Sequence, residues 1–94
     1  MNSSKAARVQ ISGASLLMLL GIQGGRICGG RWDENYLSLE LLISHESLPE
    51  VEPAASYPLH NLTETIETVP CVVRRVVKIG ETIVGDIHND YSTT

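Results

Sequence analysis

Aromatic side chains are scarce in this chain of 94 residues, where they make up 4% of the sequence, with no Phe and one Trp. Large rings supply much of the apolar burial in small proteins, so a core built almost without them is thin. A chain of this length forms at most one small domain and is marginally stable by itself. We therefore expect the fold to need support from a metal ion, a disulfide, a partner or further sequence.

Two long segments each lack charge of one sign. Residues 1–31 contain no acidic residue, and residues 32–70 contain no Lys or Arg. Residues 71–94 carry both signs, and the net charge of the whole chain is −4. Binding to nucleic acid depends on basic surfaces, so this net charge argues against a nucleic-acid partner.

Apolar runs long enough for a membrane span, which needs about 20 residues, are also lacking. The apolar residues 11–22, ISGASLLMLLGI, follow a basic start and precede the small-residue segment QGGRICGG. This order is typical of a secretory signal, and the lack of acids also suits an organelle transit peptide. Residues 1–30 are thus predicted as a leader, which favours a secretory or organelle-targeted protein over a cytoplasmic one. The alternative is an apolar element of the domain itself, and any membrane contact is expected through residues 11–22.

Cysteine is limited to Cys28 and Cys71. The two residues can form a disulfide if the chain is secreted, and two thiols in a cytosolic protein need no explanation. Asn61 begins the sequon Asn-Leu-Thr, so it is the predicted glycosylation site if the chain is secreted.

Residues 31–45 are predicted to contain a short strand or helix. The sequence LSLELLI, residues 37–43, alternates apolar and polar side chains until Leu42, which favours a half-buried strand. Its Leu and Glu residues favour a helix, for which Asp33 is a candidate N-cap. Both alternatives stay open, with the strand preferred.

Residues 46–69 are predicted as an acidic linker. Three of the four prolines lie in residues 46–60, and proline interrupts both helices and sheets. Within this segment, the alternation of NLTETIETV, residues 61–69, indicates a short exposed strand.

Residues 70–94 are predicted to form a β-hairpin. The sequence CVVRRVVKI, residues 71–79, is rich in β-branched residues, which favour strands over helices. Gly80-Glu81 suits the two central positions of a type II′ turn, which prefers Gly first. That turn predicts the following register: Ile79 faces Thr82, Val77 faces Val84, and Arg75 faces Asp86.

Asp86 and His88 follow the second apolar strand of this hairpin, in the sequence TIVGDIHND. Side chains two residues apart lie on one face of an extended strand, so a carboxylate and an imidazole converge there. Such a pair suits Mn, Fe or Zn, with Asp90 as a weaker third ligand. Gly85 would keep the approach to the cation clear of a side chain.

This segment, residues 82–91, resembles the first motif of the calcineurin-like metallophosphoesterases, an apolar strand followed by G-D-x-H-G. The resemblance implies that Asp86 and His88 bind one metal of a two-metal site that hydrolyses a phosphoester. Asn89 stands where the family has Gly, and the family's later motifs have no counterpart here. The resemblance therefore implies the first part of a longer enzyme, inactive by itself, and it assigns no catalytic residue in this chain.

Taken together, the patterns predict an α+β or mostly β fold, small, and incomplete if the resemblance holds. A C-terminal β-hairpin follows an apolar or amphipathic N-terminal segment. Two functions stay open, and with them the question of whether the protein is an enzyme. One is a truncated metallophosphoesterase-like chain that contributes one metal-binding strand. The alternative is a small non-catalytic binding or assembly protein whose valine-rich hairpin, residues 71–87, pairs with a protein partner or another copy.

Overall fold

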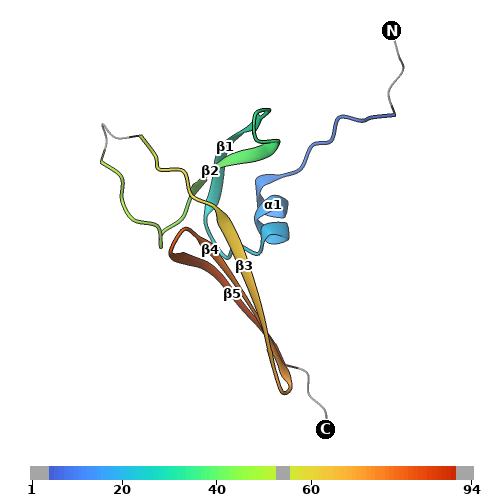
Figure 1. Cartoon of the computed structure of the whole chain (residues 1–94), viewed down its shortest axis with the longest axis vertical. Helices are drawn as coiled ribbons and strands as arrows, with labels where there is room; N and C mark the ends of the chain where they lie inside the picture. Colours follow the sequence, from blue (N-terminus) through green and yellow to red (C-terminus); the bar gives the residue numbers. More distant parts are fainter. Residues whose placement is uncertain (1–4, 53–55, 91–94) are drawn as a thin grey trace.

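The computed structural model describes residues 5–52 and 56–90, which form a small, mostly β structure with one short helix. The elements are α1 (Gly13–Leu20), β1 (Arg26–Asp33), β2 (Ser38–Ser44), β3 (Leu62–Val69), β4 (Val72–Ile79) and β5 (Thr82–Asp90). They make two antiparallel sheets, β1-β2 and β3-β4-β5 (Figure 1). The predicted fold class and the C-terminal hairpin are confirmed.

Helix α1 occupies most of the apolar segment that was predicted as part of a leader. The Ser12 side chain caps its start by accepting a hydrogen bond from the Ser15 backbone N–H at 3.1 Å, and Gly21 ends it at φ 80°. Its Leu17 side chain is buried against the rest of the molecule. No helix in the described part of the chain is long and apolar enough to cross a membrane. A leader function for residues 1–30 stays a prediction.

Strands β1 and β2 form a separate hairpin. At its turn, Asp33 Oδ1 accepts hydrogen bonds from the backbone N–H groups of Asn35 and Tyr36, and Leu37 closes the turn at φ 48°. Strand β2 matches the strand preferred from the alternation in residues 37–43. Its partner β1 begins at Arg26, inside the segment predicted as a leader.

The larger sheet is a meander in which β4 lies between β3 and β5. Its strands are joined by tight turns at Pro70-Cys71 and Gly80-Glu81, where Cys71 and Gly80 have φ values of 67° and 59°. Strand β3 matches the exposed strand expected at residues 61–69, and every one of its residues is exposed.

The register between β4 and β5 differs from the prediction because β5 contains a β-bulge. Val84 has no partner on β4, and its side chain enters the core, where it is 3% exposed. The pairing beyond the bulge is therefore shifted by one residue. As predicted, Ile79 faces Thr82, but Val77 faces Gly85 and Arg75 faces Ile87.

The core lies between α1, the segment that follows it and one face of the larger sheet. Its buried residues are Leu17, Ile22, Val77 and Val84. Gly85 is also buried. A Cβ at this position would lie only 1.9 Å from the backbone oxygen of Gly21. The predicted thinness of the core is evident, since only short aliphatic side chains fill it.

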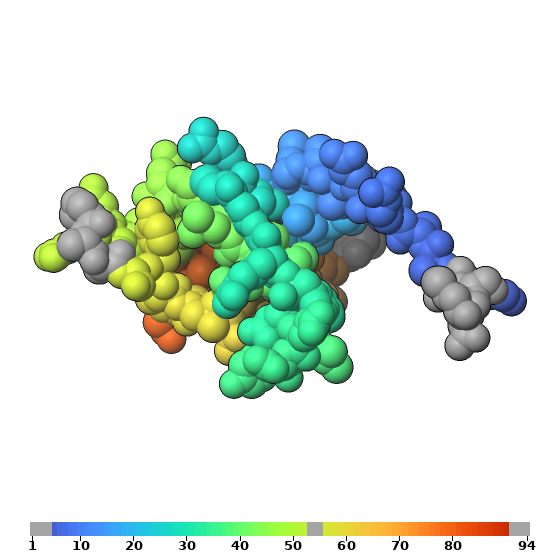
Figure 2. Space-filling model, turned by 90° about the horizontal axis from the view of Figure 1, so that it is seen from above, coloured from blue at the N-terminus to red at the C-terminus, as the bar shows by residue number. Residues whose placement is uncertain are grey.

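The molecule is far from spherical, with dimensions of 60 × 44 × 22 Å and a radius of gyration of 17.0 Å. A compact chain of this length has a radius of about 12 Å. Residues 5–12 are exposed and extended, and they run away from the body of the molecule (Figure 2).

Candidate functional site on the open face of the sheet

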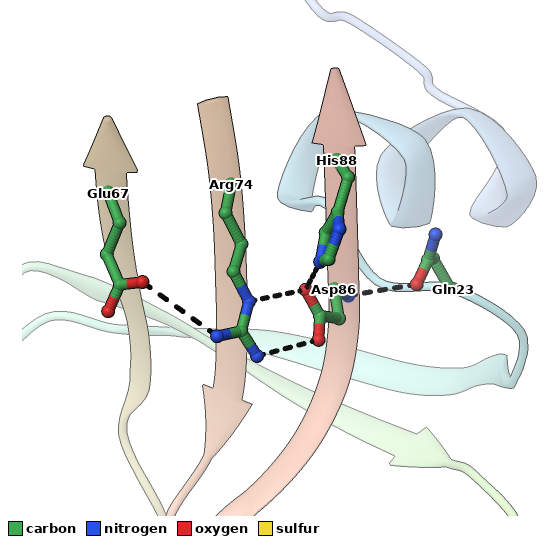
Figure 3. A network of polar contacts seen from close by, with 5 residues as sticks. All are labelled: Gln23, Glu67, Arg74, Asp86 and His88. Carbon is green, nitrogen blue, oxygen red and sulfur yellow. Dashed lines mark hydrogen bonds and ion pairs between the residues drawn. The ribbon is translucent and has the colours of Figure 1, made fainter. Parts of the chain in front are cut away.

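The side chains of Asp86 and His88 lie together on the face of the larger sheet that points away from the core, called here the open face. Residues two apart on β5 share this face, as the sequence predicted. His88 Nε2 lies 2.8 Å from Asp86 Oδ1 (Figure 3). The carboxylate and the imidazole thus converge, but they converge on each other.

Arg74 from the neighbouring strand β4 holds the Asp86 carboxylate from the other side. Its Nε and Nη2 atoms donate to Asp86 Oδ1 and Oδ2, both at 3.0 Å. Its Nη1 lies 3.8 Å from Glu67 Oε2 on β3. These polar side chains form a row across the three strands, called here the charge ladder: Glu67, Arg74, Asp86 and His88 (Figure 3).

The ion-pair partner of Asp86 differs from the predicted one. The predicted register placed Asp86 opposite Arg75, but the bulge at Val84 places it opposite Val76. Arg75 instead points to the core-facing side, where it contacts Glu64 of β3 and lies beside Gly21. Arg74 reaches Asp86 diagonally across the open face.

The contacts within the charge ladder shift the pKa values of Asp86 and Arg74. The hydrogen bond from Arg74 is the main cause that lowers the pKa of Asp86, burial acts in the opposite direction, and the hydrogen bond with His88 lowers it further. The same hydrogen bond raises the pKa of Arg74. Asp86 is therefore a carboxylate at neutral pH, and its contact with His88 requires a proton on Nε2.

Gln23 forms hydrogen bonds with backbone groups of β5 at and near Asp86. The Gln23 N–H donates to the Val84 carbonyl at 2.8 Å, and its side-chain Oε1 accepts from the Asp86 N–H at 2.9 Å. Gln23 therefore occupies the outer edge of β5 at Val84 and Asp86 as a short added strand would. Nothing in the local sequence pointed to this residue, which lies 63 positions before Asp86.

This geometry bears on the proposed metal ligands. Both Asp86 oxygens already accept from Arg74, so a cation would have to displace a bidentate guanidinium. Within residues 5–52 and 56–90, no three His, Cys, Asp or Glu side chains are grouped to hold a metal ion. Gly85 does not clear a cation's approach, because it faces the core and makes room for the Gly21 carbonyl. Metal binding by Asp86 and His88, with Asp90, stays a prediction.

Asn61 and the two cysteines lie outside the charge ladder. Asn61 is exposed just before β3, and its carbonyl accepts from the Gly80 N–H at 3.1 Å. Its glycosylation stays a prediction. Cys28 and Cys71 are both exposed and are not joined by a disulfide.

A second feature is the outer edge of β3, which the sequence did not single out as a site. Strand β3 is an edge strand of the larger sheet. The valine-rich β4 is the central strand, and it pairs with both β3 and β5. Its turn pairs Val69 with Val72, so by alternation the backbone groups of Glu64, Ile66 and Thr68 point away from β4. This row of donors and acceptors forms one edge of the larger sheet.

Comparison with protein-family models, curated proteins and solved structures gives no match for this chain. The metallophosphoesterase resemblance of residues 82–91 is therefore neither supported nor overturned. The sites described here must be interpreted from their own chemistry.

Proposed function

We propose that this protein is a small non-catalytic binding and assembly module, and that the β3 edge pairs with an extended strand of another polypeptide. The observation that carries this proposal is the regular, unpaired backbone edge of β3. Strand β3 has 8 residues, contains neither Lys nor Pro, and pairs with β4 without a bulge. Lysine, proline and bulges are among the devices that protect such edges in monomeric proteins. The charges that β3 does carry, Glu64 and Glu67, each contact an arginine of β4, so the backbone edge stays open to an added strand.

The surface area of the chain supports a protein partner. The molecule exposes 8102 Å² for a mass of 10.2 kDa. A compact monomer of this mass exposes about 5,300 Å². Apolar side chains contribute to this excess, including Ile66 on β3, which is 64% exposed. Pairing through β3 would cover part of this surface.

The open face favours binding over catalysis. Arg74 contacts both Asp86 and Glu67, and Asp86 also contacts His88, so these four side chains are held by one another. The depression beside the ladder, lined by Thr65, Val76, Lys78 and Ile83 among others, holds about 170 Å³. Small-molecule sites usually enclose about 300–1,000 Å³.

The proposal is tested with extended peptides as probes. A phage-displayed library of random peptides is selected against the purified full chain, and bound peptides are mapped by amide chemical shifts. We expect the largest shifts at Glu64, Ile66 and Thr68. We also expect Ile66→Pro, which removes an outward N–H without removing a bond to β4, to weaken binding about tenfold or more.

The matched control is Ile83→Pro on β5, the strand at the opposite edge of the sheet. It should leave peptide binding at β3 unchanged provided that circular dichroism shows an intact fold. Peptides that bind elsewhere, or that bind the Ile66→Pro variant equally well, would overturn the proposal.

A further inference from the structure

The β3 edge suits a second copy of this chain as its partner, and this inference rests on the proposed function. We infer that two copies pair antiparallel along β3 about a twofold axis at Ile66, which makes one continuous six-stranded sheet. An isologous contact of this kind uses each favourable pairing twice. The side chains and charges of β3 decide whether its edge is compatible with itself.

Symmetry restricts the register. A twofold axis perpendicular to the sheet keeps each side chain on its own face, so a residue can pair only with one an even number of positions away. Registers centred on Glu64 or Glu67 place identical carboxylates opposite each other and are unfavourable. Two central registers remain, with the axis at Thr65 or at Ile66.

The register centred on Ile66 is the better of the two. Ile66 then packs against Ile66 of the other copy, which covers an apolar side chain that is 64% exposed. In this register Glu64 faces Thr68, and Glu67 faces Thr65. Centring on Thr65 would instead place Ile66 against Glu64. Aliphatic pairs stabilise neighbouring strands, and the Ile66 register places no acid directly opposite another.

The two acids on β3 each contact an arginine of β4 within the same copy. Glu64 contacts Arg75, and this hydrogen bond lowers the pKa of Glu64. Glu67 lies 3.8 Å from Arg74. Each glutamate therefore meets the other edge with an arginine beside it, which lowers the repulsion between the two edges.

Sedimentation equilibrium of the full chain tests self-association from about 10 μM to about 1 mM. We expect a reversible monomer–dimer equilibrium that Ile66→Pro and Ile66→Lys each weaken about tenfold or more. Ile66→Lys needs no change of backbone, so it keeps the test valid if the proline variant is misfolded. A chain that stays monomeric at the highest concentration overturns the inference.

Cross-linking tests the register in a Cys28→Ser, Cys71→Ser background. Ile66→Cys should form a disulfide-linked dimer on oxidation, because the two Cα atoms would lie about 5.5 Å apart. The control Thr63→Cys should not, since its two copies would lie about 20 Å apart. Cross-linking at residue 63, or a dimer in which neither position reacts, overturns this arrangement. A monomer that still selects β3-binding peptides would overturn the self-pairing while the proposed function stands.

Discussion

Most of the polar contacts described on the open face involve Asp86. Its side chain accepts from Arg74 and contacts His88, and its backbone N–H donates to Gln23. A carboxylate that makes such contacts in the folded state and loses them on unfolding links stability to pH. The same contacts determine whether a cation can reach it.

The first prediction concerns acid stability. The folded state lowers the pKa of Asp86, so the unfolded chain binds its proton more readily. The stabilisation is present above the unfolded pKa, about 3.9, and is lost as pH falls through the lower folded pKa. Urea unfolding from neutral to acidic pH should therefore show a shallower decline for Asp86→Asn than for the wild type. Asp90→Asn removes a carboxylate from the same strand as a control, and equal slopes for Asp86→Asn and the wild type would contradict the prediction.

A second prediction concerns Mn²⁺ and Zn²⁺. If Asp86 and His88 bind these ions, Arg74 competes for the carboxylate. Calorimetry should then show affinity about tenfold higher for Arg74→Ala than for the wild type, because one charge-assisted contact no longer opposes binding. The double variant Asp86→Ala, His88→Ala should not bind. Indistinguishable heats for all three proteins would remove these two residues as metal ligands.

At the scale of the elements, the contact between Gly21 and Gly85 joins the end of α1 to β5. The Gly21 carbonyl occupies the space in which a side chain at residue 85 would lie. This close approach places Gln23 along the β5 edge and Val84 in the core. The bulge, the helix end and the added edge contact therefore form one unit.

The third prediction follows from this contact. Gly85→Ala places a Cβ 1.9 Å from a backbone oxygen, so the segment after α1 must move away from β5. We expect the free energy of unfolding, measured in urea, to fall by about 1–3 kcal/mol. Gly29→Ala is the matched control, because its Cβ meets nothing within 4 Å. That variant should stay within about 0.5 kcal/mol of the wild type, and a similar effect at both positions would contradict this account.

The sequence predicted the positions of the strands better than it predicted which residues pair between them. Valine content and turn residues located β4 and β5, and alternation located β3. The register failed at Val84, because no local pattern predicted the bulge there, which adjoins a contact with Gly21 more than sixty positions earlier. For the same reason, sequence reasoning chose Arg75 as the partner of Asp86, whereas Arg74 is the residue on its face.

At the scale of the whole molecule, a small core supports an extended shape. The buried core consists of Leu17, Ile22, Val77 and Val84, and two of these lie in the segment predicted as a leader. A leader that is removed would take Leu17 and Ile22 with it. The structure therefore links the fate of residues 13–22 to the stability of the larger sheet.

The fourth prediction uses two leucines of the same helix. Leu17 is 9% exposed and Leu19 is 67% exposed. Leu17→Ala should destabilise the protein by about 2–5 kcal/mol, through lost burial and a residual cavity. Leu19→Ala should change stability by no more than about 0.5 kcal/mol. Equal, small effects in urea unfolding would show that α1 does not contribute to the fold in solution.

The position of Gln23 on β5 has a consequence for how far assembly can proceed. A sheet with two unpaired edges can add chains at both edges and grow into a fibre. A sheet with one unpaired edge stops at a dimer. If β3 pairs as proposed, Gln23, which bonds to Val84 and Asp86, would already occupy that part of the opposite edge of the sheet. One glutamine near the helix end would thus hinder the addition of a further strand at this part of β5.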